Sequence, residues 1–215
     1  MLVSDQARFI FVHVQKTAGL SFEAVLRENF PDLRQWHGRH GRARDGVTEW
    51  GAQRWEAYFS FAFVRNPWDR LVSWYSMIDR ERRALPFHKR WQRAPFKQKI
   101  WNQVVQKGRT FDDFVEHCTD VVFDNDCYKS FAFNQIDYLT DEAGLPIVSR
   151  VGRFETLETD SREIFAHLGL RTSLPRRNRS SHGHYSEWYS PRTRDIVAKR
   201  FARDIETFGY TFDPR

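Results

Sequence analysis

The sequence predicts an α/β fold of three layers, α/β/α, in which helices cover both faces of a mainly parallel central sheet. Two apolar segments rich in β-branched and aromatic residues, at positions 8–14 and 59–64, have the composition of buried strands. A helix signal follows each of them, at Ser21 after the first and at Pro67 after the second. Strands that alternate with helices in this way favour parallel pairing, so both segments are expected near the centre of the sheet.

The remaining elements follow in chain order from the same rules of periodicity and capping. The first helix extends from Ser21 to about Asn29, and the helix at Pro67 continues through Tyr75. The other expected elements are helices at 50–58, 111–118, 159–168 and 191–208, short strands at 135–139 and 147–154, and loops at 34–46 and 171–185. No internal repeat or long linker interrupts this pattern, so we expect one domain over residues 1–215.

The composition is that of a globular protein with a preference for acidic ligands. Hydrophobic residues make up 40% of the 215 positions, which excludes a disordered chain and suffices for a sizeable core. There are 34 Lys+Arg against 28 Asp+Glu, a formal net charge of +6, and 27 of these cations are arginines. A guanidinium binds phosphate, sulfate or carboxylate through two hydrogen bonds, so the excess indicates acidic ligands, although a GC-rich genome produces the same bias.

The cysteines and the apolar segments limit the compartment. Cys118 and Cys127 are too few for a disulfide framework and lack metal-site spacing, so we expect small, partly buried side chains. No apolar run approaches the roughly 18 residues of a membrane span, and no signal segment precedes the first strand. A cytoplasmic location is therefore the default expectation.

Residues 80–109 form a basic insertion with ten Lys or Arg and one acidic residue, Glu81, interleaved with aromatic side chains. We expect it to be too basic for the core. It either contacts an acidic acceptor or forms a solvated helical face. The same interleaving is also found in nucleic-acid-binding modules, but here it is confined to one insertion and a few loops.

The segment from Phe9 to Phe22 reads as a buried strand, a short loop and the start of a helix. Such a loop directs backbone N–H groups and the positive end of a helix dipole at one point, and Lys16 adds a mobile cation. It predicts a site for phosphate or sulfate, the alternative being an ordinary turn with a surface lysine. Because Lys16 precedes Gly19, the order of the ATP-binding motif GxxxxGK[ST] is not met, and a metal-dependent kinase is disfavoured.

The segment from Phe61 to Ser73 repeats this arrangement, with Arg65 at the end of the second strand and Ser73 about two turns along the next helix. Together Arg65 and Ser73 could bind one phosphate. Taken singly, Arg65 could equally form a surface ion pair, and Ser73 could face solvent.

These two segments together resemble the sulfotransferases, particularly the carbohydrate (family 2-like) branch and its bacterial relatives. The segments 151–155 and 204–212 also match that branch. The resemblance implies a P-loop NTPase-like sulfotransferase fold and transfer of a sulfuryl group to a hydroxyl of a carbohydrate or related acceptor. The implied donor is 3′-phosphoadenosine 5′-phosphosulfate (PAPS), the product is adenosine 3′,5′-bisphosphate, and no metal is required.

The resemblance also implies roles for individual residues. Lys16 would contact the bridging or a sulfuryl oxygen and stabilise the charge on the leaving 5′-phosphate. The expected donor contacts are Lys16, Thr17, Ala18, Gly19, Leu20 and Ser21 around the 5′-phosphosulfate, Arg65 and Ser73 at the 3′-phosphate, and Asn178, Arg179 and Ser180 in a late loop that could instead be a flexible surface segment.

A base must remove the proton of the attacked hydroxyl, and histidine is the usual choice because its pKa lies near neutrality. His37 and His40 fall between the two donor segments, where the branch that the chain resembles tends to place its base. His40 fits best by its spacing before the segment 43–45, and His37 is second. Asp45, Glu49, His182 and His184 remain alternatives, and His13 is expected to serve the strand. The expected acceptor is a hydroxylated carbohydrate or glycolipid, and the excess of positive charge favours an acidic one. A kinase-like enzyme and a nucleic-acid-binding module are the rival functions.

Overall fold

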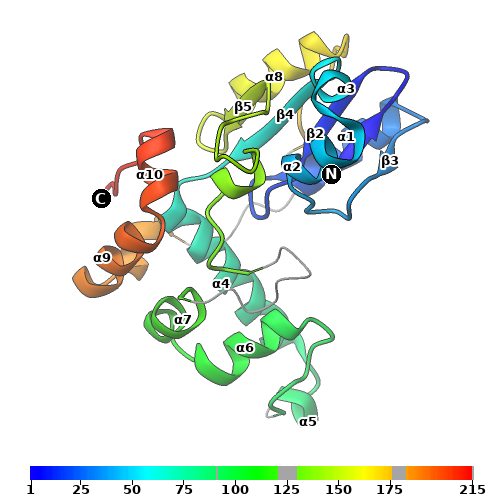
Figure 1. The fold of residues 1–215 in the computed structure, drawn as a ribbon. Coiled ribbons are helices and arrows are strands. Elements are labelled where there is room, and N and C mark those ends of the chain that lie inside the picture. The colour runs from blue at the N-terminus through cyan, green and yellow to red at the C-terminus, as the bar shows by residue number, and fades with distance from the viewer. Residues whose placement is uncertain (91, 121–129, 176–182, 215) are drawn as a thin grey trace. The chain divides into compact units, whose positions relative to one another are not determined.

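The computed structural model describes residues 1–90, 92–120, 130–175 and 183–214. The chain forms two compact units (Figure 1). The first contains Met1–Arg65 and the described part of Gln135–Arg179, and the second contains Asn66–Asn134 and the described part of Ser180–Arg215. Each unit has a hydrophobic cluster of its own.

The first unit is built on a five-stranded sheet with the order β3-β1-β2-β4-β5. The strands are β1 (Leu2–Ser4), β2 (Phe9–Val12), β3 (Arg34–Gln35), β4 (Phe59–Val64) and β5 (Arg150–Arg153). Strand β4 pairs in parallel with β2 and β5, whereas β1 is antiparallel to both of its neighbours. Four of the five strands therefore run in one direction, which confirms the prediction of a mainly parallel sheet.

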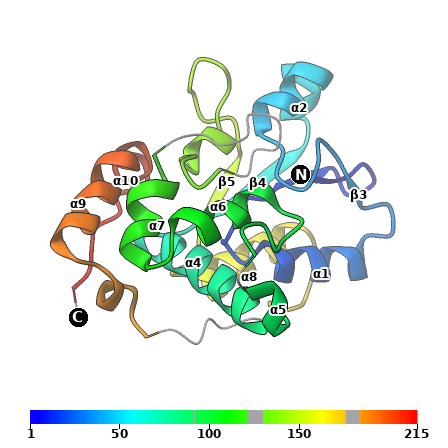
Figure 2. The same ribbon diagram turned by 90° about the horizontal axis from the view of Figure 1, so that it is seen from below.

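Helices cover both faces of this sheet. Alternate residues of β2 and β4, among them Phe11 and Phe63, pack against α1 (Gly19–Asn29) and α8 (Leu157–His167). The ring of Phe22 on α1 lies 4.3 Å from that of Phe63 and 5.4 Å from that of Phe165 on α8. The pair α2 (Ala43–Trp50) and α3 (Ala52–Glu56) lies on the other side of the sheet from α1 and α8 (Figure 2). This is the predicted three-layer arrangement.

Two expected elements of the first unit were wrong. The expected strand at 135–139 is a 3-10 turn, η1 (Ile136–Tyr138), because the chain folds back through a bridge between Thr140 and Pro146. The expected loop at 34–46 contains β3 and the start of α2, whose first turn is held by a hydrogen bond from the Arg42 N–H to Asp45 at 2.9 Å. The strand β5 falls within the segment predicted at 147–154.

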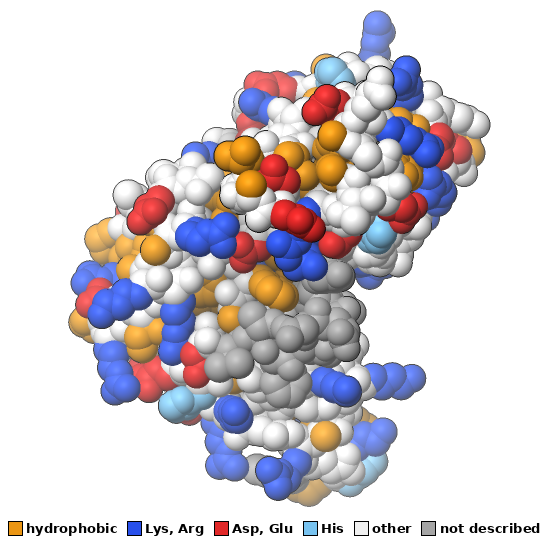
Figure 3. Space-filling view, in the orientation of Figure 1, with side chains coloured by type: hydrophobic (Ala, Val, Ile, Leu, Met, Phe, Trp, Pro, Cys, Tyr) orange, Lys and Arg blue, Asp and Glu red, His pale blue; other side chains and the backbone are white. Residues whose placement is uncertain are grey.

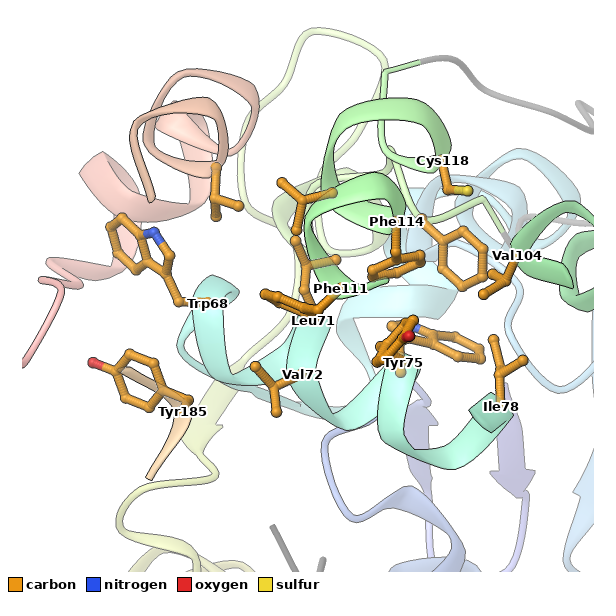
Figure 4. Close-up of a cluster of buried hydrophobic side chains, with 14 of the residues drawn as sticks. Trp68, Leu71, Val72, Tyr75, Ile78, Val104, Phe111, Phe114, Cys118 and Tyr185 are labelled. Atoms are coloured by element: carbon orange, nitrogen blue, oxygen red, sulfur yellow. The ribbon is translucent and has the colours of Figure 1, made fainter. Parts of the chain in front are cut away.

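The second unit is helical, with α4 (Pro67–Ala84), α5 (Phe87–Arg90), α6 (Lys99–Lys107), α7 (Phe111–Cys118), η2 (Tyr185–Trp188), α9 (Pro191–Arg200) and α10 (Ala202–Phe208). Side chains of α4, α6 and α7 point toward one another in its core (Figure 4). The expected single helix at 191–208 divides into α9 and α10, because the buried Phe201 between them leaves helical geometry at φ −112° and ψ 26°.

The expectation that the basic insertion lies outside the core was wrong for α6. This helix is amphipathic, and Ile100 and Val104 on one of its faces belong to the buried cluster of the second unit. The cations lie on its other face and in the segment before it.

Cys118 is buried at the end of α7, and burial raises the pKa of its thiol to about 12. Cys127 lies outside the described residues. None of the described helices is long and apolar enough to cross a membrane.

Candidate functional site

The loop between β2 and α1 has the backbone of an anion-binding site. Lys16 and Ala18 both adopt the left-handed conformation, with φ of 69° and 67°. This conformation costs a residue with a side chain about 1–2 kcal/mol, and such strain gathers at functional sites. Ala18 is the N-cap residue of α1, and no side chain caps the helix. The N–H group of Ser21 donates to the Ala18 carbonyl at 2.9 Å, whereas those of Gly19 and Leu20 have no acceptor within the helix and are available to an anion.

Some side chains of this loop are buried and stabilise its conformation, whereas others are exposed to solvent. Thr17 is fully buried, and its hydroxyl donates to the Val14 carbonyl at 2.9 Å. Leu20 is 56% exposed, whereas Ser21 is buried. We infer that Thr17 and Leu20 can offer an anion their backbone N–H groups only, because the Thr17 hydroxyl proton is already donated and Leu20 is apolar.

Arg65 of the second predicted segment contacts the first segment at Lys16. Its guanidinium donates to the carbonyl of Lys16 at 3.3 Å and lies over the ring of Phe154 at 3.9 Å. The Gln135 side chain fixes the Arg65 backbone, accepting from its N–H at 2.8 Å and donating to its carbonyl at 2.7 Å. Arg65 is only 4% exposed, which does not fit a surface ion pair.

The other expected donor contacts are distributed elsewhere. Ser73 is buried on α4 in the second unit, so it does not face open solvent as a lone helix serine would. Asn178, Arg179 and Ser180 lie outside the described residues, as does His182.

His13 lies directly beneath the start of α1. Its ring stacks on Phe11 with centroids 5.5 Å apart, and a Cβ atom on Gly19 would come within 1.9 Å of its Nε2. Only a glycine therefore allows the loop to close over this ring. Burial, and after it the neighbouring His40, lower the pKa of the His13 imidazole well below its ordinary value, so the ring is neutral.

His40 contacts His13 and has a defined tautomer. The two rings meet edge to face, with centroids 4.6 Å apart. The Nδ1 atom of His40 lies 2.9 Å from the His13 backbone carbonyl. A carbonyl can only accept, so Nδ1 carries the hydrogen, and in the neutral ring the basic lone pair lies on Nε2.

The segment that carries His40 is also fixed through its neighbour. Arg39 forms an ion pair with Glu23 at 3.4 Å, and Glu23 lies on α1 with its side chain 9% exposed. Glu23 also pairs with Arg27 one turn further along the helix, at 2.9 Å. The helix that opens at the anion loop thus holds the candidate base in place as well.

The other candidate bases have structural partners that account for them. His37 pairs with Glu49 at 2.8 Å, and Glu49 also accepts from the indole of Trp36 at 3.2 Å. Asp45 holds the first turn of α2. His184 lies in the second unit, with Nδ1 2.8 Å from the Ser186 hydroxyl. This arrangement favours His40 as the base.

Over the described ranges, no group of three or more His, Cys, Asp or Glu is placed to hold a metal ion. The groups that the candidate site brings together are backbone N–H groups, a lysine, an arginine and an imidazole.

Comparison with known proteins identifies the family. The family model described as "Sulfotransferase family" matches residues 1–211, a range that runs through both units. The chain belongs to the sulfotransferase family. The match covers nearly the whole chain, so neither a kinase-like enzyme nor a nucleic-acid-binding module is favoured.

Similar curated proteins are the sulfotransferases named carbohydrate sulfotransferase 10. The protein of Pongo abelii is 25% identical over 240 residues, which cover 98% of this chain and 66% of that protein. Those of Xenopus laevis and Danio rerio are each 26% identical over 98% of this chain and cover 67% and 66% of their own lengths. The chain thus spans about two thirds of the length of these relatives. No solved structure matches the chain significantly.

Sequence reasoning missed the contribution of three residues to this candidate site. The contacts of Gln135 with Arg65 and of Glu23 with Arg39 join segments that are far apart in the sequence, so no local pattern indicates them. His13 had a signal, because the alternation Phe9, Phe11, His13 places its ring on the sheet face that α1 covers.

Proposed function

We propose that the chain is a PAPS-dependent O-sulfotransferase that transfers a sulfuryl group to a hydroxyl of a carbohydrate. The observation that carries this proposal is the uncapped start of α1, preceded by Lys16 and Ala18 at positive φ and joined by the guanidinium of Arg65. Anions bind at helix N-termini because the helix dipole is positive there and because the first N–H groups have no partner within the helix.

The residues of the loop fit the phosphosulfate group of the donor. The N–H groups from Thr17 to Leu20 bind its oxygens, and Lys16 supplies a positive charge. Gly19 leaves room for the His13 ring that lies against the start of α1. Arg65 and Ser73 are proposed to bind the 3′-phosphate, and Asn178, Arg179 and Ser180 to cover the donor. The chemistry that the donor supplies is a sulfuryl group on a good phosphate leaving group.

The proposed reaction is a single in-line displacement. The Nε2 atom of His40 takes the proton of the acceptor hydroxyl while the oxygen–sulfur bond to the acceptor forms and the bond from sulfur to the bridging oxygen breaks. Lys16 stabilises the negative charge that develops on that bridging oxygen, where it contributes more in the transition state than in the ground state. Neutral His13 supports His40 without adding a competing charge.

The acceptor is proposed from the relatives and from charge. The relatives are named carbohydrate sulfotransferases, which supports a sugar hydroxyl as the nucleophile. The excess of arginine supports an acidic acceptor, either a free glycan or a glycolipid.

The proposal is tested by incubating the protein with PAPS labelled in its sulfate and a panel of neutral and acidic oligosaccharides. We expect label on at least one oligosaccharide, and we expect Lys16→Ala to abolish most of the transfer. The exposed Lys199 on α9 gives a matched control, and Lys199→Ala should transfer at the native rate. Transfer of the γ-phosphate from ATP with magnesium, with no sulfate transfer, would assign the chain to the kinases instead.

A further inference from the structure

The second unit carries a patch of exposed cations around an exposed aromatic ring. We call it the basic platform, and it consists of Phe87 with Lys89, Arg90, Arg93, Lys97 and Lys99. Lys and Arg side chains gather over α5 and α6 with few acidic side chains among them (Figure 3). None of these residues belongs to the site described above.

The platform is a fixed part of the fold. The side chain of Asn102 on α6 binds both the N–H and the carbonyl of Phe96, at 2.9 and 2.8 Å. The Gln106 amide donates to the Arg93 carbonyl at 2.9 Å. Since Ile100 anchors the same helix in the core, the main chain that carries the cations is held at several points.

The positive charge of the platform is not neutralised within the part of the chain that the structure describes. Just before it, on α4, Arg80 pairs with Glu81 at 3.3 Å and Arg83 with Asp79 at 2.7 Å. The five platform cations form no ion pair with a described acidic residue. Like charges so close together repel one another, so an anionic partner lowers their electrostatic energy.

The exposed aromatic ring indicates a partner that has apolar as well as anionic groups. Phe87 is 75% exposed, more than Leu145 at 63% or Leu20 at 56%. It is followed directly by His88, Lys89 and Arg90, and all of 86–90 is exposed, so the patch presents an open face rather than an enclosing pocket. An apolar side chain among cations matches a surface with anionic headgroups above an apolar layer.

We propose that the basic platform binds anionic phospholipid membranes, with Phe87 entering the interface and the cations contacting the headgroups. This binding is independent of the sulfuryl transfer proposed above, because it uses none of the same residues. It would hold the enzyme at a surface on which lipid-linked acceptors are concentrated.

The test is co-sedimentation of the full chain with phosphatidylcholine vesicles that contain or lack phosphatidylserine. We expect binding only with phosphatidylserine and a loss of binding as salt rises. Each Lys or Arg near such a surface contributes about fivefold in affinity, so Lys89→Gln with Arg90→Gln should weaken binding about 25-fold. The matched control is Arg171→Gln with Lys199→Gln, which removes the same charge from exposed positions elsewhere and should bind as the native protein does.

The apolar contribution is tested separately. Phe87→Ala should weaken binding about tenfold with an unchanged salt dependence, because it removes buried area and no charge. Leu145→Ala, which alters another exposed apolar residue, in the first unit, should have no effect.

Equal binding to both kinds of vesicle, or equal losses in the platform and control variants, would overturn the proposal. So would binding of heparin by the native protein with no binding of phosphatidylserine vesicles, because the platform would then be a surface for acidic glycans. Stabilisation by adenosine 3′,5′-bisphosphate, measured on the same variants, separates this outcome from failure of the proposed sulfotransferase function.

Discussion

The close contact between Gly19 and His13 makes Gly19→Ala an informative perturbation. The added Cβ atom would lie 1.9, 2.0 and 2.6 Å from three atoms of the His13 ring, about 1.5 Å inside the 3.4 Å at which ordinary contact begins. The ring has little room to move, because it is buried between Phe11 and His40. The clash must therefore be relieved by displacing the start of α1.

The magnitude follows from two opposing effects. Extra volume in a packed core costs about 1–3 kcal/mol, and this overlap is near the upper end of that range. Alanine is a better helix former than glycine by up to about 1 kcal/mol. We expect Gly19→Ala to lower the free energy of unfolding by about 2 kcal/mol and to weaken binding of adenosine 3′,5′-bisphosphate.

A double-mutant cycle isolates the contact. His13→Ala creates a cavity and is destabilising by itself, but it also removes the ring that the new methyl group would meet. In that background Gly19→Ala should be neutral or stabilising, which gives a coupling energy of about 3 kcal/mol from urea unfolding of the four proteins. A coupling energy below about 0.5 kcal/mol would refute the claim that Gly19 is required by His13.

Three further predictions concern the reaction and its pH dependence. Lys16→Ala should lower turnover about 10²–10³-fold and donor affinity much less, and near-native turnover would show that Lys16 takes no part. His40→Ala should lower sulfation about 10²–10⁴-fold with bisphosphate binding intact, whereas His37→Ala should keep most of the activity; the reverse order would move the base to His37. The pKa of His13 is lowered in the folded state, so below about pH 6.5 the unfolded state binds more protons. The free energy of unfolding therefore decreases as the pH is lowered, by up to about 1.4 kcal/mol per pH unit. His13→Phe should lose that part of the dependence in urea titrations, and unchanged pH slopes would contradict the assignment.

The strands and helices with a strong local pattern could be predicted from the sequence. The segment 59–64 is apolar except for Ser60 and is the strand β4. Pro67 marks the start of α4, where the Asn66 side chain accepts from the Trp68 N–H at 3.1 Å. The short strand β1 was missed, because three residues give too little periodicity and its place depends on pairing with β2.

The candidate site could be predicted where a charged residue directly follows a predicted strand. Lys16 and Arg65 each follow a strand, and the ends of the parallel strands β2 and β4 meet at one edge of the sheet. The links from Glu23 to Arg39 and from Gln135 to Arg65 join residues that no local pattern connects. The prediction for the basic insertion was wrong for α6 because it rested on the many charged residues. The apolar residues Ile100 and Val104, which have the spacing of one helix face, were given too little weight.

The most direct test of the central claim is the response of thermal stability to three nucleotides. If the loop after β2 and Arg65 form a donor site, adenosine 3′,5′-bisphosphate at about 100 times its dissociation constant should stabilise the protein by about 2.7 kcal/mol, or raise Tm by about 5–11 °C. AMP, which lacks the 3′-phosphate, should have a much smaller effect, and Arg65→Ala should weaken bisphosphate binding about ten- to a hundredfold. Equal shifts with AMP and the bisphosphate, or a larger shift with ATP and magnesium, would contradict the account.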